Sequence, residues 1–149
     1  MSALGLRPAI VGDAADIHEL LLKRAAEIPL AVETLEQQEA LYAAIRKILA
    51  FGQSWIATEG GTVAGVVLVD AAEVGRHWGE NELLNLRYAA GQGLDGLLGE
   101  VIARNVPIVA GVRDANRSGL AELLESLGFC LTETRVGERH FRHRPGERK

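Results

Sequence analysis

The sequence predicts a protein of the α/β class (α+β), with seven strands and about four helices in a single domain of residues 1–149. The apolar residues switch repeatedly between a helical and an extended period, and two glycine-centred turns join neighbouring strands as hairpins. With 149 residues, 48% of them apolar, the chain is long enough to bury a substantial core. The expected elements are strand 6–10, helix 13–28, helix 34–51, strands 54–58, 63–70 and 83–89, helix 94–102, strand 107–113, helix 120–127 and strands 129–136 and 138–143.

Capping and breaking residues set the bounds of the first two helices. Asp13 opens the first helix, and Pro29 ends it because proline cannot continue the helical hydrogen bonds. Thr34 and Gln37 have the spacing of a capping box at the start of the second helix. Gly52 marks the end of that helix.

Glycines also divide the strands from one another. Gly60-Gly61 predicts a hairpin turn, and the strand that follows it is almost wholly apolar, as expected for a strand buried on both faces. Gly128 is the expected C-terminal cap of the last helix, and Gly137 the turn of a closing hairpin.

Composition excludes several classes of protein. A net charge of −4 argues against a general nucleic-acid binder, which would carry a basic excess. No run of about 18 apolar residues predicts a membrane span. The single cysteine, Cys130, excludes an internal disulfide and is expected to pack in the core of a cytoplasmic protein. Residues 144–149 are expected to form a flexible tail.

A glycine-rich string, Gly91-Gln92-Gly93-Leu94-Asp95-Gly96, lies between a predicted strand and a predicted helix. Such a turn lets backbone N–H groups approach an anion, and the positive end of the helix favours phosphate there. The string matches a nicotinamide dinucleotide fingerprint, with Asp114 eighteen residues beyond Gly96. That remote alternative needs successive strand–helix–strand crossovers, whereas a hairpin meander precedes this string.

Three segments resemble the GNAT superfamily of acyl-CoA-dependent N-acetyltransferases. The opening Leu6-Arg7-Pro8-Ala9, followed by Asp13 and Asp16-Ile17, is similar to its first strand and helix. Residues 112–118 (VRDANRS) are similar to its late strand and asparagine-bearing turn, and residues 123–129 (LLESLGF) to the helix that ends in Leu-Gly-Phe. The resemblance covers roughly residues 5 to 143.

This resemblance implies a mixed, mostly antiparallel sheet whose fourth and fifth strands splay apart around the pantetheine arm of acetyl-CoA, the co-substrate. The backbone of Leu86, Arg87 and Tyr88 would bind that arm, and the amides of the glycine string would bind the pyrophosphate. Asn116 would lie near the thiol end. Asparagine is equally suited to a helix N-cap or a turn without any ligand, and the two roles are compatible.

The glycine string departs from the family pattern, which has Arg or Gln, two residues, Gly, one residue, then Gly or Ala. With Gly93 as the first family glycine, Ala90 and Asp95 fill the other two positions; with Gly91 first, Tyr88 and Gly93 do. A carboxylate about 4 Å from a phosphate costs roughly 1–4 kcal/mol, whereas each charge-assisted amide bond returns about 1.5–3 kcal/mol. Asp95 therefore weakens binding without forbidding it. It is also a natural N-cap for the following helix.

The acid and base that move protons in the reaction are not obvious. Many relatives carry a catalytic tyrosine where this chain has Leu124. Glu82 is the preferred general base, with Glu80 and Asp70 behind it, and each is also explained as a solvated acid at a strand end. Tyr88 is expected to be a core residue rather than a replacement acid. No metal is expected, since His140 and His143 point to opposite faces of a strand.

The leading hypothesis is therefore an N-acetyltransferase that moves an acetyl group from acetyl-CoA to an amine of a small molecule, a peptide or a protein N-terminus by direct attack. The alternative is a GNAT-fold binding or regulatory module without turnover. The acceptor pocket is expected between the second helix, the loop 73–81 and the final hairpin. No nucleic-acid or membrane partner is expected, and a homodimer through the last strands is compatible with the sequence.

Overall fold

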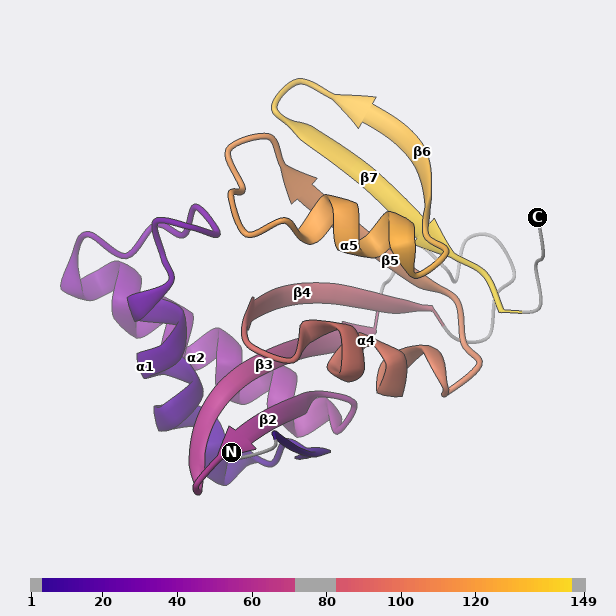
Figure 1. The fold of residues 1–149 in the computed structure, drawn as a ribbon. Coiled ribbons are helices and arrows are strands. Elements are labelled where there is room, and N and C mark those ends of the chain that lie inside the picture. Colours follow the sequence, from indigo (N-terminus) through magenta and orange to yellow (C-terminus); the bar gives the residue numbers. More distant parts are fainter. Residues whose placement is uncertain (1–3, 72–82, 146–149) are drawn as a thin grey trace.

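The computed structural model describes residues 4–71 and 83–145, and a seven-stranded sheet forms its centre (Figure 1). The strands follow the order β1-β2-β3-β4-β5-β7-β6, and each neighbouring pair is antiparallel except β4 and β5. The predicted mixed, mostly antiparallel sheet is confirmed. The strands are β1 (Gly5–Pro8), β2 (Trp55–Glu59), β3 (Thr62–Ala71), β4 (Leu84–Gly91), β5 (Ile108–Arg113), β6 (Cys130–Arg135) and β7 (Glu138–His143).

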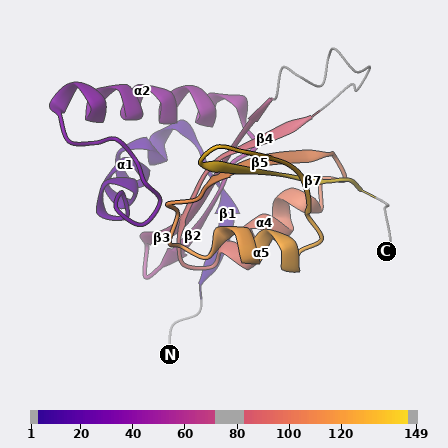
Figure 2. The same cartoon turned by 90° about the horizontal axis from the view of Figure 1, so that it is seen from above.

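Helices cover both faces of the sheet. Helices α1 (Ala14–Lys23) and α2 (Leu35–Phe51) lie on one face, and α4 (Leu94–Ile102) and α5 (Leu120–Ser126) lie on the other (Figure 2). A short 3-10 helix, η1 (Val11–Asp13), leads into α1. No helix within residues 4–71 and 83–145 is long and apolar enough to cross a membrane.

Two apolar cores follow from this arrangement, one on each face. Strand β3 contributes to both, because Val66 and Leu68 join the core under α1 and α2 while Val67 and Val69 join the core under α4 and α5. All four side chains are fully buried, which confirms the prediction from the wholly apolar run.

The predicted capping box of the second helix is confirmed, whereas the predicted length of the first is wrong. The Gln37 amide donates to Thr34 Oγ1 at 3.1 Å, and Gln37 Oε1 accepts from the Thr34 amide at 3.1 Å. Helix α1 ends at Lys23 rather than at residue 28. Beyond it the chain forms irregular turns. There the Leu30 amide donates to the carbonyl of Ala25 at 2.9 Å, five residues earlier in the chain, whereas an α-helical hydrogen bond joins residues four apart.

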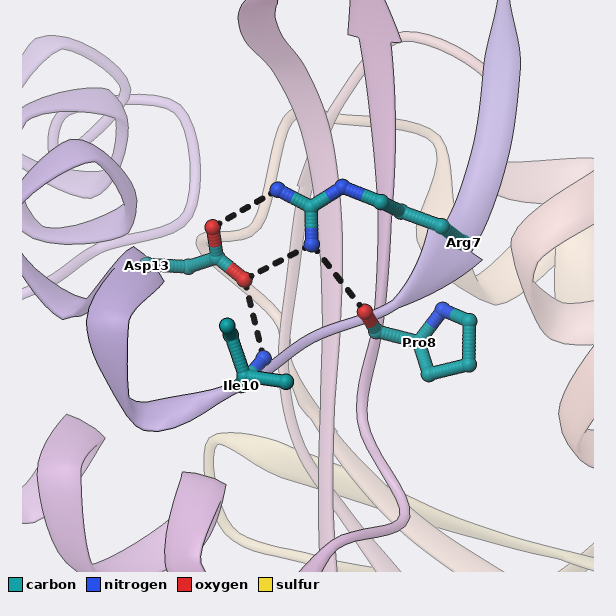
Figure 3. A network of polar contacts seen from close by, with 4 residues as sticks. All are labelled: Arg7, Pro8, Ile10 and Asp13. Carbon is teal, nitrogen blue, oxygen red and sulfur yellow. Dashed lines mark hydrogen bonds and ion pairs between the residues drawn. The ribbon is translucent and has the colours of Figure 1, made fainter.

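Arg7 and Pro8, near the start of the chain, have a structural role at the corner between β1 and α1 (Figure 3). Arg7 donates two bonds to the Asp13 carboxylate, at 2.8 and 3.0 Å, and the Ile10 amide donates a third at 2.8 Å. Arg7 also reaches the Pro8 carbonyl at 3.2 Å. Asp13 is only 7% exposed, and the hydrogen bond from Arg7 lowers the pKa of its carboxyl below the ordinary value.

Strand β4 extends to Gly91 rather than to the expected Ala89, because two glycines let β3 and β4 approach closely. Gly65 pairs with Gly91 across the two strands. A Cβ at Gly65 would lie 1.8 Å from the carbonyl oxygen of Gln92, and one at Gly91 would lie 2.3 Å from that of Ala64. Gly91 also has a positive φ of 89°. Only glycine fits at these positions.

Two smaller expectations fall near the C-terminal end. Cys130 is the first residue of β6 and is half-buried, so the expectation that it is packed within the core is wrong. The reason is that β6 is an edge strand, whose remaining residues are all exposed. The expected flexible tail, 144–149, lies mostly outside the described residues, which end at Pro145.

Candidate active site

The parallel strands β4 and β5 are hydrogen-bonded over only three residue pairs and then part. The pairs are Leu84 with Ile108, Asn85 with Val109 and Leu86 with Ala110. Beyond Leu86 the other edge of β4 stays paired with β3 as far as Gly91, whereas its β5 edge has no strand partner. Figure 1 shows the two strands diverging from this point. Backbone N–H and C=O groups are therefore presented on one open edge.

A cavity of about 260 Å³ opens where the strands part. It is lined by residues 86–89 of β4, by Gly111 and Arg113 of β5, by Asn116 and Leu120, and by residues 28–30 after the first helix. Leu86, Arg87, Tyr88 and Asn116, which sequence reasoning proposed for coenzyme binding, therefore meet at one cleft.

A β-bulge lies where the cleft begins. Leu68 pairs with Tyr88 and the next residue, Val69, pairs with Leu86, so Arg87 is the extra residue on β4. The Arg87 guanidinium donates to Asp70 Oδ2 at 2.9 Å. Asp70, weighed as a reserve general base, is thus held in an ion pair.

Asn116 lines the cleft and also shapes the turn after β5. Its Oδ1 accepts from the amide of Ser118 at 2.8 Å and from the Ser118 hydroxyl at 2.6 Å. The N-cap of α5 is Gly119, so the expected N-cap role of Asn116 is wrong and its expected turn role is confirmed. Within the described part of the chain these bonds use only Oδ1, and the two Nδ2 donors remain for a ligand.

The glycine string spans the end of β4 and the first turn of α4. Gly93, in the left-handed region with φ 74°, is the N-cap, and Asp95 is an exposed residue of the first turn. The expectation that Asp95 caps the helix is therefore wrong. The Gln92 amide already donates to the Ala64 carbonyl at 2.8 Å, whereas the first amides of α4 lack intrahelical acceptors. The string lies outside the lining of the 260 Å³ cavity, past the Ala89 end of the lined part of β4.

Proton-transfer groups are sparse around this cleft. Leu124, which the sequence resemblance aligns with a catalytic tyrosine, is fully buried in the core under α4 and α5 and serves as an apolar packing residue. Tyr88 is half-buried: it packs against the core under α1 and α2, as expected, but it also lines the cleft. Glu82 and Glu80, the other candidate bases, lie outside the described residues.

A second cavity of about 320 Å³ adjoins the cleft on the α2 side. Pro29, Leu30, Tyr88 and Arg113 line both cavities. Sequence reasoning placed an acceptor pocket between the second helix, the loop 73–81 and the final hairpin. The loop lies outside the described residues, and of the other two elements the second helix lines this cavity whereas the hairpin does not. The segment after the first helix, which also lines it, was not expected there. The available signal was the apolar run 30–32 directly after Pro29, which is unusual for a surface connection.

The two histidines of β7 make separate contacts. His140 Nε2 lies 3.0 Å from Glu138 Oε1, and the His143 ring packs against Phe129 with 5.1 Å between centroids. Among residues 4–71 and 83–145 no three histidine, cysteine or acidic side chains lie together as metal ligands would.

No family model and no curated protein matches the sequence of the chain. Solved structures nevertheless share its architecture. The polyamine N-acetyltransferase of Drosophila melanogaster, which forms N-acetylagmatine, matches with a TM-score of 0.71 and 14% identity over 95% of this chain and 100% of its own. A GNAT-family acetyltransferase from Streptococcus agalactiae gives 0.71 and 15% over 97% and 96%. The protein yncA of Salmonella typhimurium, solved with its cofactor acetyl-CoA, gives 0.66 and 21% over 99% and 97%.

The chain therefore has the GNAT fold, as the resemblance of its motifs implied. Within the described ranges β4 and β5 form the one parallel pair of strands, which removes the basis for the nicotinamide alternative, since that fold requires a doubly wound parallel sheet.

Proposed function

We propose that this protein is an acetyl-CoA-dependent N-acetyltransferase that acts on the amine of a small molecule or a peptide N-terminus. The observation that carries the proposal is the parting of β4 and β5 after Leu86, with a cavity at the point of divergence. The Drosophila and Streptococcus structures compared above are named as acetyltransferases, and the Salmonella structure holds acetyl-CoA.

In this proposal the open edge of β4 binds the pantetheine arm in the manner of an added strand, through the backbone of residues 87–89. Asn116 Nδ2 donates to the arm from the opposite side of the cleft. The first amides of α4, after Gly93, bind the pyrophosphate. Among the described residues, the β5 edge of β4 beyond Leu86 has no paired strand, Asn116 Nδ2 has no acceptor, and the first amides of α4 have no intrahelical acceptor.

Bound acetyl-CoA supplies the thioester whose carbonyl carbon the amine attacks; the C–S bond breaks, and the proton lost by the amine ends on the CoA sulfur. The protein contributes mainly position and polarisation, with β4 amides near Leu86 holding the acyl oxygen. Glu82 remains the proposed general base. Leu124 supplies no acid, so the sulfur takes its proton from the amine or from water.

A catalytically inactive binding module is the second candidate. One observation favours it: Leu124, at the position that the resemblance aligns with the family's acid, is a buried apolar side chain and supplies no proton. The two candidates share acetyl-CoA binding and differ only in turnover.

Calorimetry with CoA and acetyl-CoA tests the binding that both candidates need, and release of free thiol with a panel of amines tests turnover. No heat at millimolar coenzyme would contradict both. Binding without acetylation of any amine would select the inactive module.

A pair of variants tests whether the coenzyme binds in the cleft. Asn116→Asp keeps the Oδ1 acceptor of the turn but replaces the Nδ2 donors with a carboxylate oxygen. We expect it to weaken acetyl-CoA binding by about tenfold or more, since it loses a hydrogen bond and adds like charge. Ser118→Ala is the matched control, because it loosens the same turn and keeps the donors. Equal affinities for both variants would show that Asn116 serves the turn alone.

A further inference from the structure

The lining of the second cavity allows an inference about the acceptor. This inference rests on the proposed function. Pro29, Leu30, Tyr88 and Arg113 form the wall that it shares with the cleft. An acceptor in the second cavity would therefore present its amine to the opening in which the acyl group is held. A volume of about 320 Å³ suits a small molecule.

The charge of the two cavities argues against a polycationic acceptor. Among the described residues no aspartate, glutamate or histidine lines either cavity. Of the residues that the structure describes, Arg87 and Arg113 are the charged ones in the two linings, and Arg87 is already paired with Asp70. A diamine or guanidine compound would bring a second positive charge into a space whose charged lining side chains are arginines.

Arg113 is the cation left for a ligand. Its Nη1 donates to the Pro29 carbonyl at 3.2 Å, which holds the guanidinium at the shared wall. Within residues 4–71 and 83–145 no carboxylate lies within ion-pair distance of it. A guanidinium carries five donors, so most of them remain for a planar carboxylate.

Apolar side chains form much of the rest of the second cavity. Leu30, Val32, Leu41 and Ala44 line it, and the polar uncharged side chains among its described lining residues are Gln37 and Tyr88. We propose that the acceptor is a free α-amino acid with an apolar side chain, whose carboxylate pairs with Arg113 and whose side chain packs against α2. The nearby cation favours the neutral, nucleophilic form of its amine.

The reaction then forms two bonds, C–N and S–H, and breaks two, C–S and N–H. The α-nitrogen bonds to the thioester carbonyl carbon, the C–S bond of acetyl-CoA breaks, and one proton passes from nitrogen to sulfur. The products are an N-acetyl amino acid and CoA, without oxidation or reduction.

Acceptor comparison tests the proposal in the intact protein. L-leucine, L-phenylalanine and L-methionine are compared with L-leucinamide, isoamylamine, a peptide with N-terminal leucine, and agmatine, by release of free thiol. We expect kcat/KM for leucine to exceed that for leucinamide by about tenfold or more, since the two differ only in the carboxylate. Agmatine used as well as leucine would overturn the proposal, and so would leucinamide used as well as leucine.

Arg113→Gln is the decisive variant, read as the ratio of kcat/KM for leucine to that for leucinamide. The ratio cancels any effect on acetyl-CoA, which shares the wall. We expect it to fall about 10- to 100-fold, mainly through KM, and Arg113→Lys to restore part of it. Arg117→Gln, an exposed arginine that lines neither cavity, is the matched control and should leave the ratio unchanged.

A measurement of acetyl-CoA binding distinguishes failure of this inference from failure of the proposed function. Binding with acetylation of agmatine or the peptide alone would overturn this inference and leave the proposed function standing. Absence of acetyl-CoA binding would overturn both. A ratio unchanged in Arg113→Gln would show that the carboxylate is recognised elsewhere or not at all.

Discussion

The corner at the end of β1 and the cleft at the end of the β4–β5 pairing both hold polar groups at the end of a strand, and they differ in what satisfies those groups. In the corner, the Asp13 carboxylate takes two bonds from Arg7 and one from the Ile10 amide. In the cleft, the β5 edge of β4 beyond Leu86 has no strand partner, and Asn116 Nδ2 has no bond within the described residues. Since polar groups in a fold are normally paired, we assign the first region a structural role and take the second as the place of the proposed coenzyme contacts.

The largest expected effect comes from the glycine contact that fixes the end of β4. Gly65→Ala would place a Cβ 1.8 Å from the Gln92 carbonyl oxygen, which is backbone and cannot turn aside. We expect a loss of about 3 kcal/mol or more in the free energy of unfolding, measured by urea denaturation.

Gly99→Ala is the matched control for this substitution. No atom lies within 4 Å of a Cβ built at Gly99, which sits in helix α4. We expect it to stabilise the protein by about 0.5–1 kcal/mol. Equal effects from the two substitutions would mean that β3 and β4 do not approach closely at Gly65.

Asp13→Asn removes the charge from the closed corner and leaves the shape of the side chain. It weakens a charge-assisted, bidentate contact, so we expect a loss of about 1.5–3 kcal/mol in the free energy of unfolding at pH 7. The affinity for acetyl-CoA should not change by more than about twofold, because the corner contributes nothing to the cleft lining. A large loss of affinity with unchanged stability would reverse the roles of the two regions.

The pH dependence of that loss has a defined sign. The hydrogen bond from Arg7 lowers the pKa of Asp13 in the folded protein, whereas the unfolded value is about 3.9. The contribution of ionised Asp13 is therefore full above the unfolded pKa and is lost as the pH falls through the lower folded pKa. The difference in unfolding free energy between the wild type and Asp13→Asn should shrink from pH 5 to pH 3. A constant difference would contradict an ionised, paired Asp13.

Local chemistry predicted the scaffold well and the site only in part. The Thr34–Gln37 box, the almost wholly apolar run of β3 and the glycine turns are local signals, and each determined an element. The N-cap of α4 was missed because it depends on where β4 ends, which the contact between Gly65 and Gly91 decides. Likewise, the first helix ends early because residues 28–30 turn to line the cleft, and Arg113 reaches Pro29 across 84 positions. Such contacts between distant segments leave no periodic trace in the sequence.

The smallest expected effect concerns Asp95, which lies where the open region meets the coenzyme in the proposed function. The exposed carboxylate in the first turn of α4 stabilises the helix terminus by about 0.3–1 kcal/mol, and it repels a pyrophosphate at the same place. Asp95→Asn should tighten acetyl-CoA binding by about 1 kcal/mol, or roughly fivefold, at low salt, measured by calorimetry.

Glu100→Gln removes the same charge from the exposed second half of the same helix and serves as the control. Because exposed charges are screened within about 8–10 Å at moderate salt, the gain in Asp95→Asn should shrink as salt is added, whereas Glu100→Gln should show little gain at any salt concentration. Equal affinities in the two variants would place the pyrophosphate away from this turn. The glycine string would then be explained by the structure alone, through the strand contact of Gly91 and the left-handed N-cap at Gly93.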